Sequence, residues 1–102
     1  MAKLIALYKK PADAAKFDRY YFDTHVPIAK KVPGLRRYEI SDGGVAGVGG
    51  ESPYHLAAIL SFDSLADIQK ALTTPEGGAT AADLGNFAQA GVDLMMFDTK
   101  EI

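Results

Sequence analysis

Short apolar runs alternate along the chain with stretches of helical periodicity, and their order leaves few folds open. Residues 3–8 (KLIALY) and 54–62 (YHLAAILSF) are apolar almost throughout, which is typical of strands that are buried on both faces. Residues 92–99 form a similar run, and residues 35–41 form a more polar one that fits a position nearer a sheet edge. With one helical stretch after the first run and another after 54–62, the order is β-α-β-β-α-β. This order predicts an α+β, ferredoxin-like protomer with a four-stranded antiparallel sheet.

The two helical stretches are expected at residues 12–25 and 63–88. In the first, Pro27 has no N–H to donate, so the helix should kink or stop near Thr24 or His25, and Pro27 can then open a further short turn. In the second, Ser64 is a suitable N-cap. Residues 73–78 (TTPEGG) should break that helix, with a weaker helical pattern resuming after them. The apolar stripe of the first stretch consists of Phe17, Tyr20, Tyr21, Thr24, His25 and Ile28.

The expected sheet has too many apolar residues for one covered face. Two right-handed crossovers place both helices on the same side of the sheet, which should leave a polar face toward water. Three of the four expected strands instead carry apolar residues at both odd and even positions. A chain of 102 residues, which we interpret as one domain (1–102), has no spare element to cover the second face. We therefore expect a homodimer whose sheets pack face to face, a dimeric α/β-barrel.

The composition disfavours several classes of protein. The formal net charge is −2, with 11 basic and 13 acidic residues interspersed, so no nucleic-acid partner is expected. No stretch approaches the ~20 apolar residues of a membrane span, and no signal-peptide pattern is present, so we expect a cytoplasmic protein without a membrane partner. There is no cysteine, and two histidines are a weak basis for a metal site. The glycine-rich segment 42–53 does not match a nucleotide-binding motif, so no cofactor is expected.

Residues 17–41 carry an aromatic-rich helix, then His-x-Pro-hydrophobic, Pro-Gly-Leu and a strand with a tyrosine. In this arrangement, and in residues 62–77 and 82–92, the chain resembles the EthD family, which is named for ethyl tert-butyl ether degradation. The resemblance implies a dimeric α/β-barrel, a class that also includes muconolactone isomerases, small polyketide cyclases and cofactor-free monooxygenases. The residues that carry it in the first segment are Tyr20, Tyr21, His25, Pro27, Ile28, Pro33, Gly34, Leu35 and Tyr38.

Two interpretations of His25 are open. It shares a helix face with Tyr21, and it can be an acid/base catalyst that faces a pocket between helix and sheet. It can equally be a buried neutral ring bonded to a backbone carbonyl that Pro27 leaves free. Tyr38 is the expected hydrogen-bonding partner in catalysis, and Tyr21 and His55 are the expected substrate-binding residues. For Tyr38 and Tyr21 the alternative is ordinary packing, and for His55 it is a solvated strand end.

These residues lead to a functional hypothesis with alternatives from other classes. A ring base beside phenols on an apolar face predicts cofactor-free acid/base catalysis on a hydrophobic, oxygenated small molecule: an isomerase, a cyclase or a degradation enzyme. One alternative is a non-catalytic accessory or carrier protein of an ether- or aromatic-degrading oxidising system. Another is a cofactor-free monooxygenase or reductase. Asp83 and Asn86 belong to a D-x-x-N-F segment of the family, and their first interpretation is a capping or inter-element role.

Overall fold

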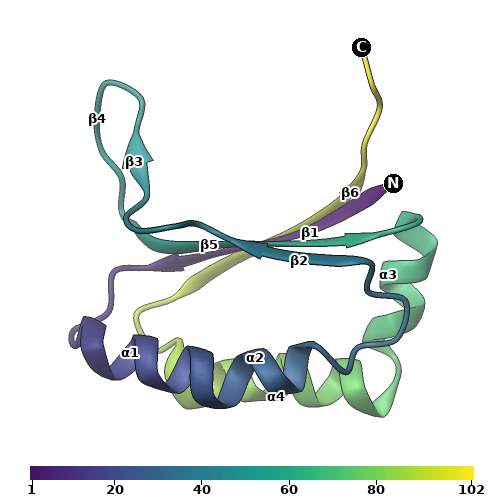
Figure 1. Ribbon diagram of the computed structural model, residues 1–102, viewed down its shortest axis with the longest axis horizontal. Coiled ribbons are helices and arrows are strands. Elements are labelled where there is room, and N and C mark those ends of the chain that lie inside the picture. The colour runs from purple at the N-terminus through teal and green to yellow at the C-terminus, as the bar shows by residue number, and fades with distance from the viewer.

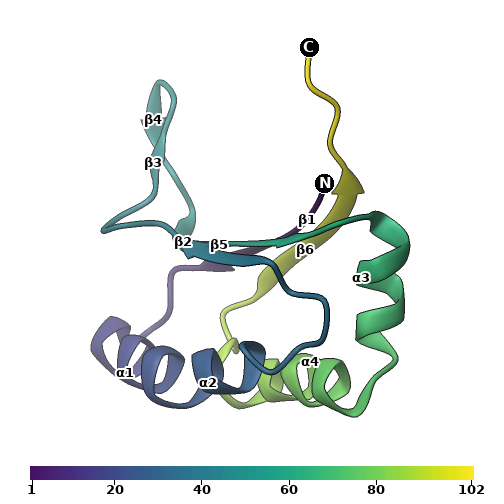
Figure 2. The ribbon, with the colours of Figure 1, turned by 45° about the vertical axis from the view of Figure 1, so that its right-hand side comes forward.

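A four-stranded antiparallel sheet carries all the helices on one of its faces (Figures 1 and 2). The computed structural model describes residues 1–102. The strands β1 (Ala2–Lys9), β2 (Arg37–Ile40), β5 (Tyr54–Phe62) and β6 (Val92–Asp98) are ordered β2-β5-β1-β6. All three strand pairs are antiparallel. The predicted ferredoxin-like α+β fold is confirmed, with strands close to the expected positions.

The first helical segment is irregular in the region where a kink or a stop was predicted, and a second short helix follows it. α1 (Ala14–Tyr20) leads directly into a π-helical turn, η1 (Tyr21–His25), and then into α2 (Val26–Ala29). In the π-helical turn the N–H of Val26 donates to the carbonyl of Tyr21, five residues back. The helix does not stop near Thr24 or His25, but its regular geometry is interrupted there by the wider turn. The prediction that Pro27 opens a further short helical turn is confirmed, because Pro27 lies at the start of α2, where a proline is tolerated.

The second helical segment breaks for only two residues. α3 (Leu65–Leu72) is capped by Ser64 as predicted, and α4 (Pro75–Phe87) starts after Thr73 and Thr74. The predicted break is confirmed, but it is shorter than residues 73–78, because Thr74 caps α4: its Oγ1 accepts from the N–H of Gly77 at 3.0 Å. Gly77 is needed there, since a Cβ atom would lie 2.0 Å from the carbonyl oxygen of Ala71. α4 thus begins in close contact with the end of α3. None of the helices is long and apolar enough to cross a membrane.

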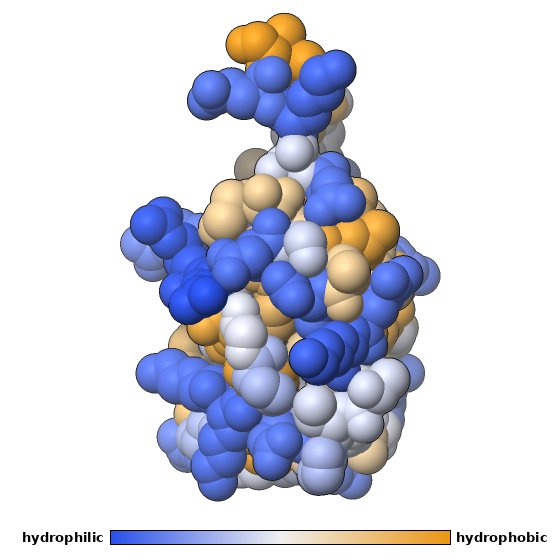
Figure 3. All heavy atoms as spheres, turned by 90° about the vertical axis from the view of Figure 1, so that its right-hand side faces the viewer, coloured by the Kyte–Doolittle hydropathy of each residue, from blue (hydrophilic) through white to orange (hydrophobic).

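The glycine-rich segment forms a small projection. β3 (Ala46–Gly47) and β4 (Gly50–Glu51) pair as a short hairpin inside the expected loop. The hairpin and the C-terminal tail both rise from the side of the sheet opposite the helices (Figure 1). Figure 3, which looks onto the end of the molecule that carries α3, shows the tail standing clear of the body and hydrophobic residues lying between hydrophilic ones.

The two faces of the sheet differ in what covers them. Tyr8 and Ala6 of β1 point toward the helices and are buried in the core. Ile5 alternates to the outer face, where it is paired with Ile59 of β5 and Met95 of β6. No element of this chain covers that outer face, and Met95 and Phe97 on it are 41% and 43% exposed. The apolar residues of the outer face are Ile5, Leu7, Ala57, Ile59, Met95 and Phe97.

Candidate active site

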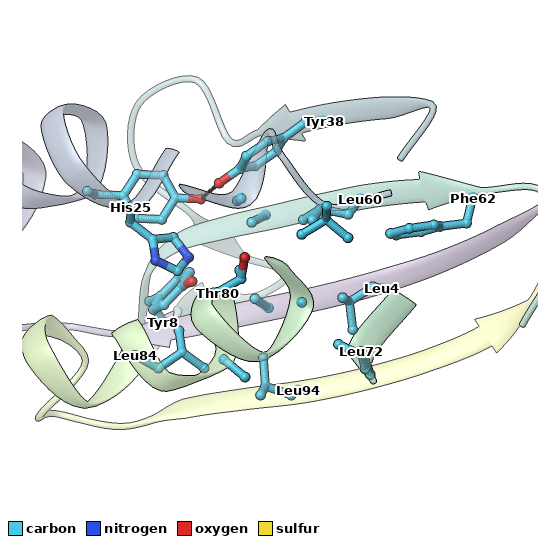
Figure 4. A pocket seen from close by; sticks show the side chains of 17 residues that line it. Leu4, Tyr8, His25, Tyr38, Leu60, Phe62, Leu72, Thr80, Leu84 and Leu94 are labelled. Carbon is cyan, nitrogen blue, oxygen red and sulfur yellow. Dashed lines mark hydrogen bonds between the residues drawn. The ribbon is translucent and has the colours of Figure 1, made fainter. Parts of the chain in front are cut away.

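A small apolar cavity lies between the sheet and the helices (Figure 4). Its volume is about 90 Å³, and 14 of its 17 lining residues are hydrophobic. An engineered cavity of roughly 150 Å³ holds benzene, so this one fits a small group or one end of a larger ligand. The lining residues are Leu4, Ala6, Tyr8, Tyr21, His25, Ala29, Val32, Tyr38, Ala58, Leu60, Phe62, Leu72, Gly77, Thr80, Ala81, Leu84 and Leu94.

His25 reaches this cavity from the π-helical turn, and a carboxylate on α4 holds its ring. Its Nδ1 lies 2.9 Å from Oδ2 of Asp83, and both side chains are almost fully buried. The other oxygen of Asp83, Oδ1, accepts from the hydroxyl of Tyr20 at 2.6 Å and from Nδ2 of Asn86 at 3.0 Å. The interpretation of His25 as a ring bonded to a backbone carbonyl freed by Pro27 is therefore wrong: its partner is a carboxylate 58 residues away.

The charges of the pair follow from its surroundings. Burial raises the pKa of the Asp83 carboxyl, but hydrogen bonds from Tyr20, Asn86 and His25 outweigh burial, and the net pKa is lowered. Burial lowers the pKa of His25, and the bond to Asp83 offsets only part of that. At neutral pH the pair is therefore a carboxylate beside a neutral imidazole. A carboxylate only accepts hydrogen bonds, so the proton sits on Nδ1 and Nε2 is left as the basic nitrogen.

Nε2 of His25 is open to the cavity. The ring is held at Nδ1, and no group of the chain hydrogen-bonds to Nε2. Since no fully buried side-chain nitrogen or oxygen lacks a partner, Nε2 must be accessible from the cavity. Figure 4 shows the ring on the wall of the cavity, among the other residues that line it. An imidazole whose one nitrogen is fixed by a carboxylate and whose other nitrogen faces an apolar space can take up a proton from a bound molecule.

Two tyrosines from different elements meet on the same cavity. The hydroxyl groups of Tyr21, on the π-helical turn, and Tyr38, on β2, are 2.5 Å apart (Figure 4). Burial raises the pKa of Tyr21, with the neighbouring Tyr38 as a further cause, and burial also raises the pKa of Tyr38. Both are therefore neutral phenols. Since only one of them can donate to the other, the second O–H of the pair is free to donate elsewhere.

His55 lies outside this cavity. Its Nε2 is 2.8 Å from Oδ1 of Asp18 on α1, and its ring meets the edge of Phe17 at 5.2 Å between centroids. The structure thus brings together three of the four residues expected in the site, His25, Tyr21 and Tyr38, and leaves His55 apart. No group of three or more His, Cys, Asp or Glu side chains is arranged to hold a metal ion.

Two residues of the cavity region were not predicted as site residues. Asp83 was expected to link elements, which it does, but its bond to His25 joins residues far apart in sequence and gave no local signal. The D-x-x-N-F segment was the available clue, because Asp83 and Asn86 lie one turn apart and Asn86 donates to the carboxylate. Tyr8 was part of an apolar strand, and nothing in that pattern distinguishes it from a packed aromatic residue.

The fold and the site together define a ferredoxin-like α+β protein with a buried His–Asp pair beside an apolar cavity. The chain belongs to the EthD family, whose domain matches residues 9–91. An EthD family protein from Bacillus halodurans has a crystal structure similar to this one, with a TM-score of 0.88 and 38% identity, covering 98% of this chain and 99% of that one. An uncharacterised 11.0 kDa protein from Rhodococcus erythropolis, encoded in the thcB–thcC intergenic region, is 35% identical over 103 residues, covering 100% of this chain and 98% of that protein.

More distant structures share the fold. SnoaB from Streptomyces nogalater, a cofactor-independent oxygenase, is 14% identical with a TM-score of 0.68, covering 99% of this chain and 94% of that one. Two ferredoxin-like proteins described as dimeric, from Bacteroides fragilis and Thermobifida fusca, are each 16% identical, with TM-scores of 0.65 and 0.68. The match covers 96% of this chain in both cases, together with 95% of the Bacteroides fragilis chain and 90% of the Thermobifida fusca chain. At these identities the likeness establishes a common architecture, and it assigns no activity to this chain.

Proposed function

We propose that this protein binds a hydrophobic, oxygenated small molecule in the cavity and moves a proton to or from it without a cofactor. Isomerisation, cyclisation and a degradative step are all reactions of this kind. One observation carries the proposal: Asp83 fixes Nδ1 of His25, and the free Nε2 faces a space with apolar walls. SnoaB, which shares this fold, is a cofactor-independent oxygenase, so the fold is compatible with catalysis that uses no cofactor.

In the proposed reaction His25 is the base and then the acid. Nε2 takes a proton from an acidic C–H or O–H of the substrate, and the carboxylate of Asp83 stabilises the imidazolium that forms. The negative charge that develops on a substrate oxygen is met by the free O–H of the Tyr21–Tyr38 pair. The proton on Nε2 is then returned at another atom of the substrate. A ligand that fills the space between the apolar walls displaces water from it, and this strengthens each of these interactions.

Deuterium exchange tests this proposal without knowledge of the natural substrate. The protein is incubated in D2O with enolisable ketones, lactones and phenols, and incorporation of deuterium at carbon is followed by mass spectrometry. We expect His25→Ala to slow the exchange by about 10²- to 10⁴-fold, the usual contribution of a general base. The control His55→Gln lies outside the cavity and should leave the rate unchanged.

The same experiment separates catalysis from carriage. A carrier protein needs only an apolar pocket, and the lining of this cavity would bind a ligand whether or not the ligand then reacts. If ligands bind but exchange is equal in the native protein and in His25→Ala, the catalytic role is wrong and the protein is a carrier or accessory module.

We further propose that the chain, acting as one domain over residues 1–102, works as a homodimer in the cytoplasm. The uncovered apolar face of the sheet supports pairing through a second copy. Two proteins with this fold are described as dimeric. Sedimentation should show a dimer at micromolar concentration, and Phe97→Glu on the outer face should yield a monomer. Phe22→Glu is the matched control, because Phe22 is similarly exposed, at 49%, but lies on the helix layer. A native protein that sediments as a monomer would rule out this assembly.

A further inference from the structure

Two polar atoms of deeply buried residues on the cavity have no partner in the chain. One is Nε2 of His25, and the other is the hydroxyl of Tyr8, a residue that is only 2% exposed. The other four of the five tyrosines each have a bonded hydroxyl: Tyr20 and Tyr54 donate to Asp83 and Asp93, and Tyr21 and Tyr38 bond to each other. Tyr8 is thus the one tyrosine whose hydroxyl makes no hydrogen bond within the chain, and it is among the most buried of the five.

The Tyr8 ring is surrounded by aromatic side chains that offer its hydroxyl no hydrogen-bond partner. Its ring is packed at 5.5 Å from each of Phe17, Tyr21 and Phe87, so a phenylalanine would fill the same space. A buried hydroxyl without a partner costs free energy, and most buried polar groups are bonded. No side-chain nitrogen or oxygen of the chain is sealed off without a partner, so the Tyr8 hydroxyl meets the cavity itself. The partner that this hydroxyl lacks is therefore one that a ligand can supply.

The protonation states give the two atoms complementary roles. Burial raises the pKa of the Tyr8 phenol, and the neighbouring Tyr38 and Asp83 raise it further, so Tyr8 stays a neutral donor. Nε2 of His25 is an acceptor because the ring carries its proton on Nδ1. A molecule that satisfies both atoms must offer an oxygen that accepts and an acidic hydrogen that donates.

We propose that the Tyr8 hydroxyl binds a ligand oxygen while Nε2 of His25 accepts a hydrogen from the same ligand, which selects uncharged phenols, enols and enolisable carbonyl compounds. This inference rests on the proposed function for the location of the ligand, but it does not require that a reaction follows. It adds Tyr8 as a substrate-binding residue and names the chemical class of the substrate.

The charges around the cavity account for the selection against anions. No lysine or arginine is among the lining residues, so a carboxylate or phosphate would lose its hydration without gaining a cation. The Asp83 carboxylate stands directly behind the His25 ring and adds repulsion. A neutral ligand with one or two oxygens avoids both penalties.

Four one-ring probes, each of which has to place only its substituted end in the cavity, test the proposal: phenol, anisole, toluene and benzoate, each titrated by NMR. Phenol donates and accepts, anisole only accepts, toluene does neither, and benzoate is an anion. In Tyr8→Phe we expect the Kd of phenol and of anisole to rise by about 2- to 10-fold, the equivalent of one hydrogen bond, and the Kd of toluene to stay the same. The control Tyr54→Phe removes a hydroxyl outside the cavity and should leave phenol binding unchanged. Phenol, but not anisole, should shift the ¹⁵N resonance of Nε2 of His25 in the native protein.

Tyr8→Phe removes no hydrogen bond within the chain, so its melting temperature should match that of the native protein. The proposal is overturned if Tyr8→Phe binds phenol as tightly as the native protein does, if benzoate binds as tightly as phenol, or if phenol leaves the His25 resonance unmoved. Phenol binding that depends on Tyr8, together with absent deuterium exchange, would refute the catalytic proposal and leave this one standing. Deuterium exchange that depends on His25 but is unchanged in Tyr8→Phe would support the catalytic proposal and refute this one.

Discussion

The two histidines of this chain form the same kind of bond in different surroundings. Nδ1 of His25 lies 2.9 Å from Asp83, and Nε2 of His55 lies 2.8 Å from Asp18. The side chains of the first pair are 4% and 6% exposed, and those of the second are 24% and 46% exposed. An Asp–His contact is therefore not by itself the mark of a site. What distinguishes His25 is enclosure, together with a second ring nitrogen that faces a cavity.

The largest expected difference between the two pairs is in catalysis. In Asp83→Asn, Tyr20 and Asn86 still donate to the side-chain oxygen, so the new amide N–H₂ must face His25. Nδ1 then has to accept, the proton moves to Nε2, and the base toward the cavity is lost. We expect deuterium exchange to fall by about 10²-fold or more, whereas Asp18→Asn should leave it unchanged.

NMR can read the change in His25 directly. The ¹⁵N shifts of the ring should show the proton on Nε2 in Asp83→Asn and on Nδ1 in the native protein. A variant that keeps the native tautomer but loses activity would mean that Asp83 acts in some other way than by setting the tautomer.

A smaller difference is expected in stability against pH. The pKa of His25 in the folded protein lies below its ordinary value of 6.5, so below pH 6.5 the unfolded chain binds more protons than the folded one. The free energy of unfolding should therefore fall as the pH drops from 6.5, by at most about 1.4 kcal/mol per pH unit for this one group. Below pH 3.8 the lowered pKa of Asp83 adds a further loss of the same sign.

Urea denaturation between pH 7.5 and 5 measures the first of these losses. His25→Gln should flatten the dependence in that range, because the titrating group is gone. A slope that is the same in His25→Gln and in the native protein would assign the pH dependence to other groups.

Much of the fold could be predicted because its signals are local. β5 lies at residues 54–62, where the apolar run placed it, and the order of the elements fixed the topology. The details of the helices were less predictable. The wider π-helical turn before Pro27 was not expected, and the break after α3 is shorter than predicted because Thr74 caps α4 while Gly77 lets its first turn pack against Ala71. A contact such as that between Gly77 and Ala71 is not encoded in either helix alone.

The site was less accessible from the sequence, for the same reason. His25, Tyr21 and Tyr38 could be selected by residue type and helical spacing. Asp83 could be selected as a site residue only from the contact between η1 and α4, and neither segment of the sequence encodes that contact alone. Tyr8 stands out only because its hydroxyl has no partner, and the absence of a partner is a property of the whole packed structure.

The alternation of side chains along β1 and β6 limits how these strands can change in evolution. Leu4 and Leu94 line the cavity, while their neighbours Ile5 and Met95 lie on the outer face. A single inserted or deleted residue in either strand would exchange the two sets, so that one event would alter both the ligand cavity and the exposed apolar surface. Relatives are therefore expected to diverge by substitution within these strands and by length in the segment 42–53, where an added residue disturbs neither surface.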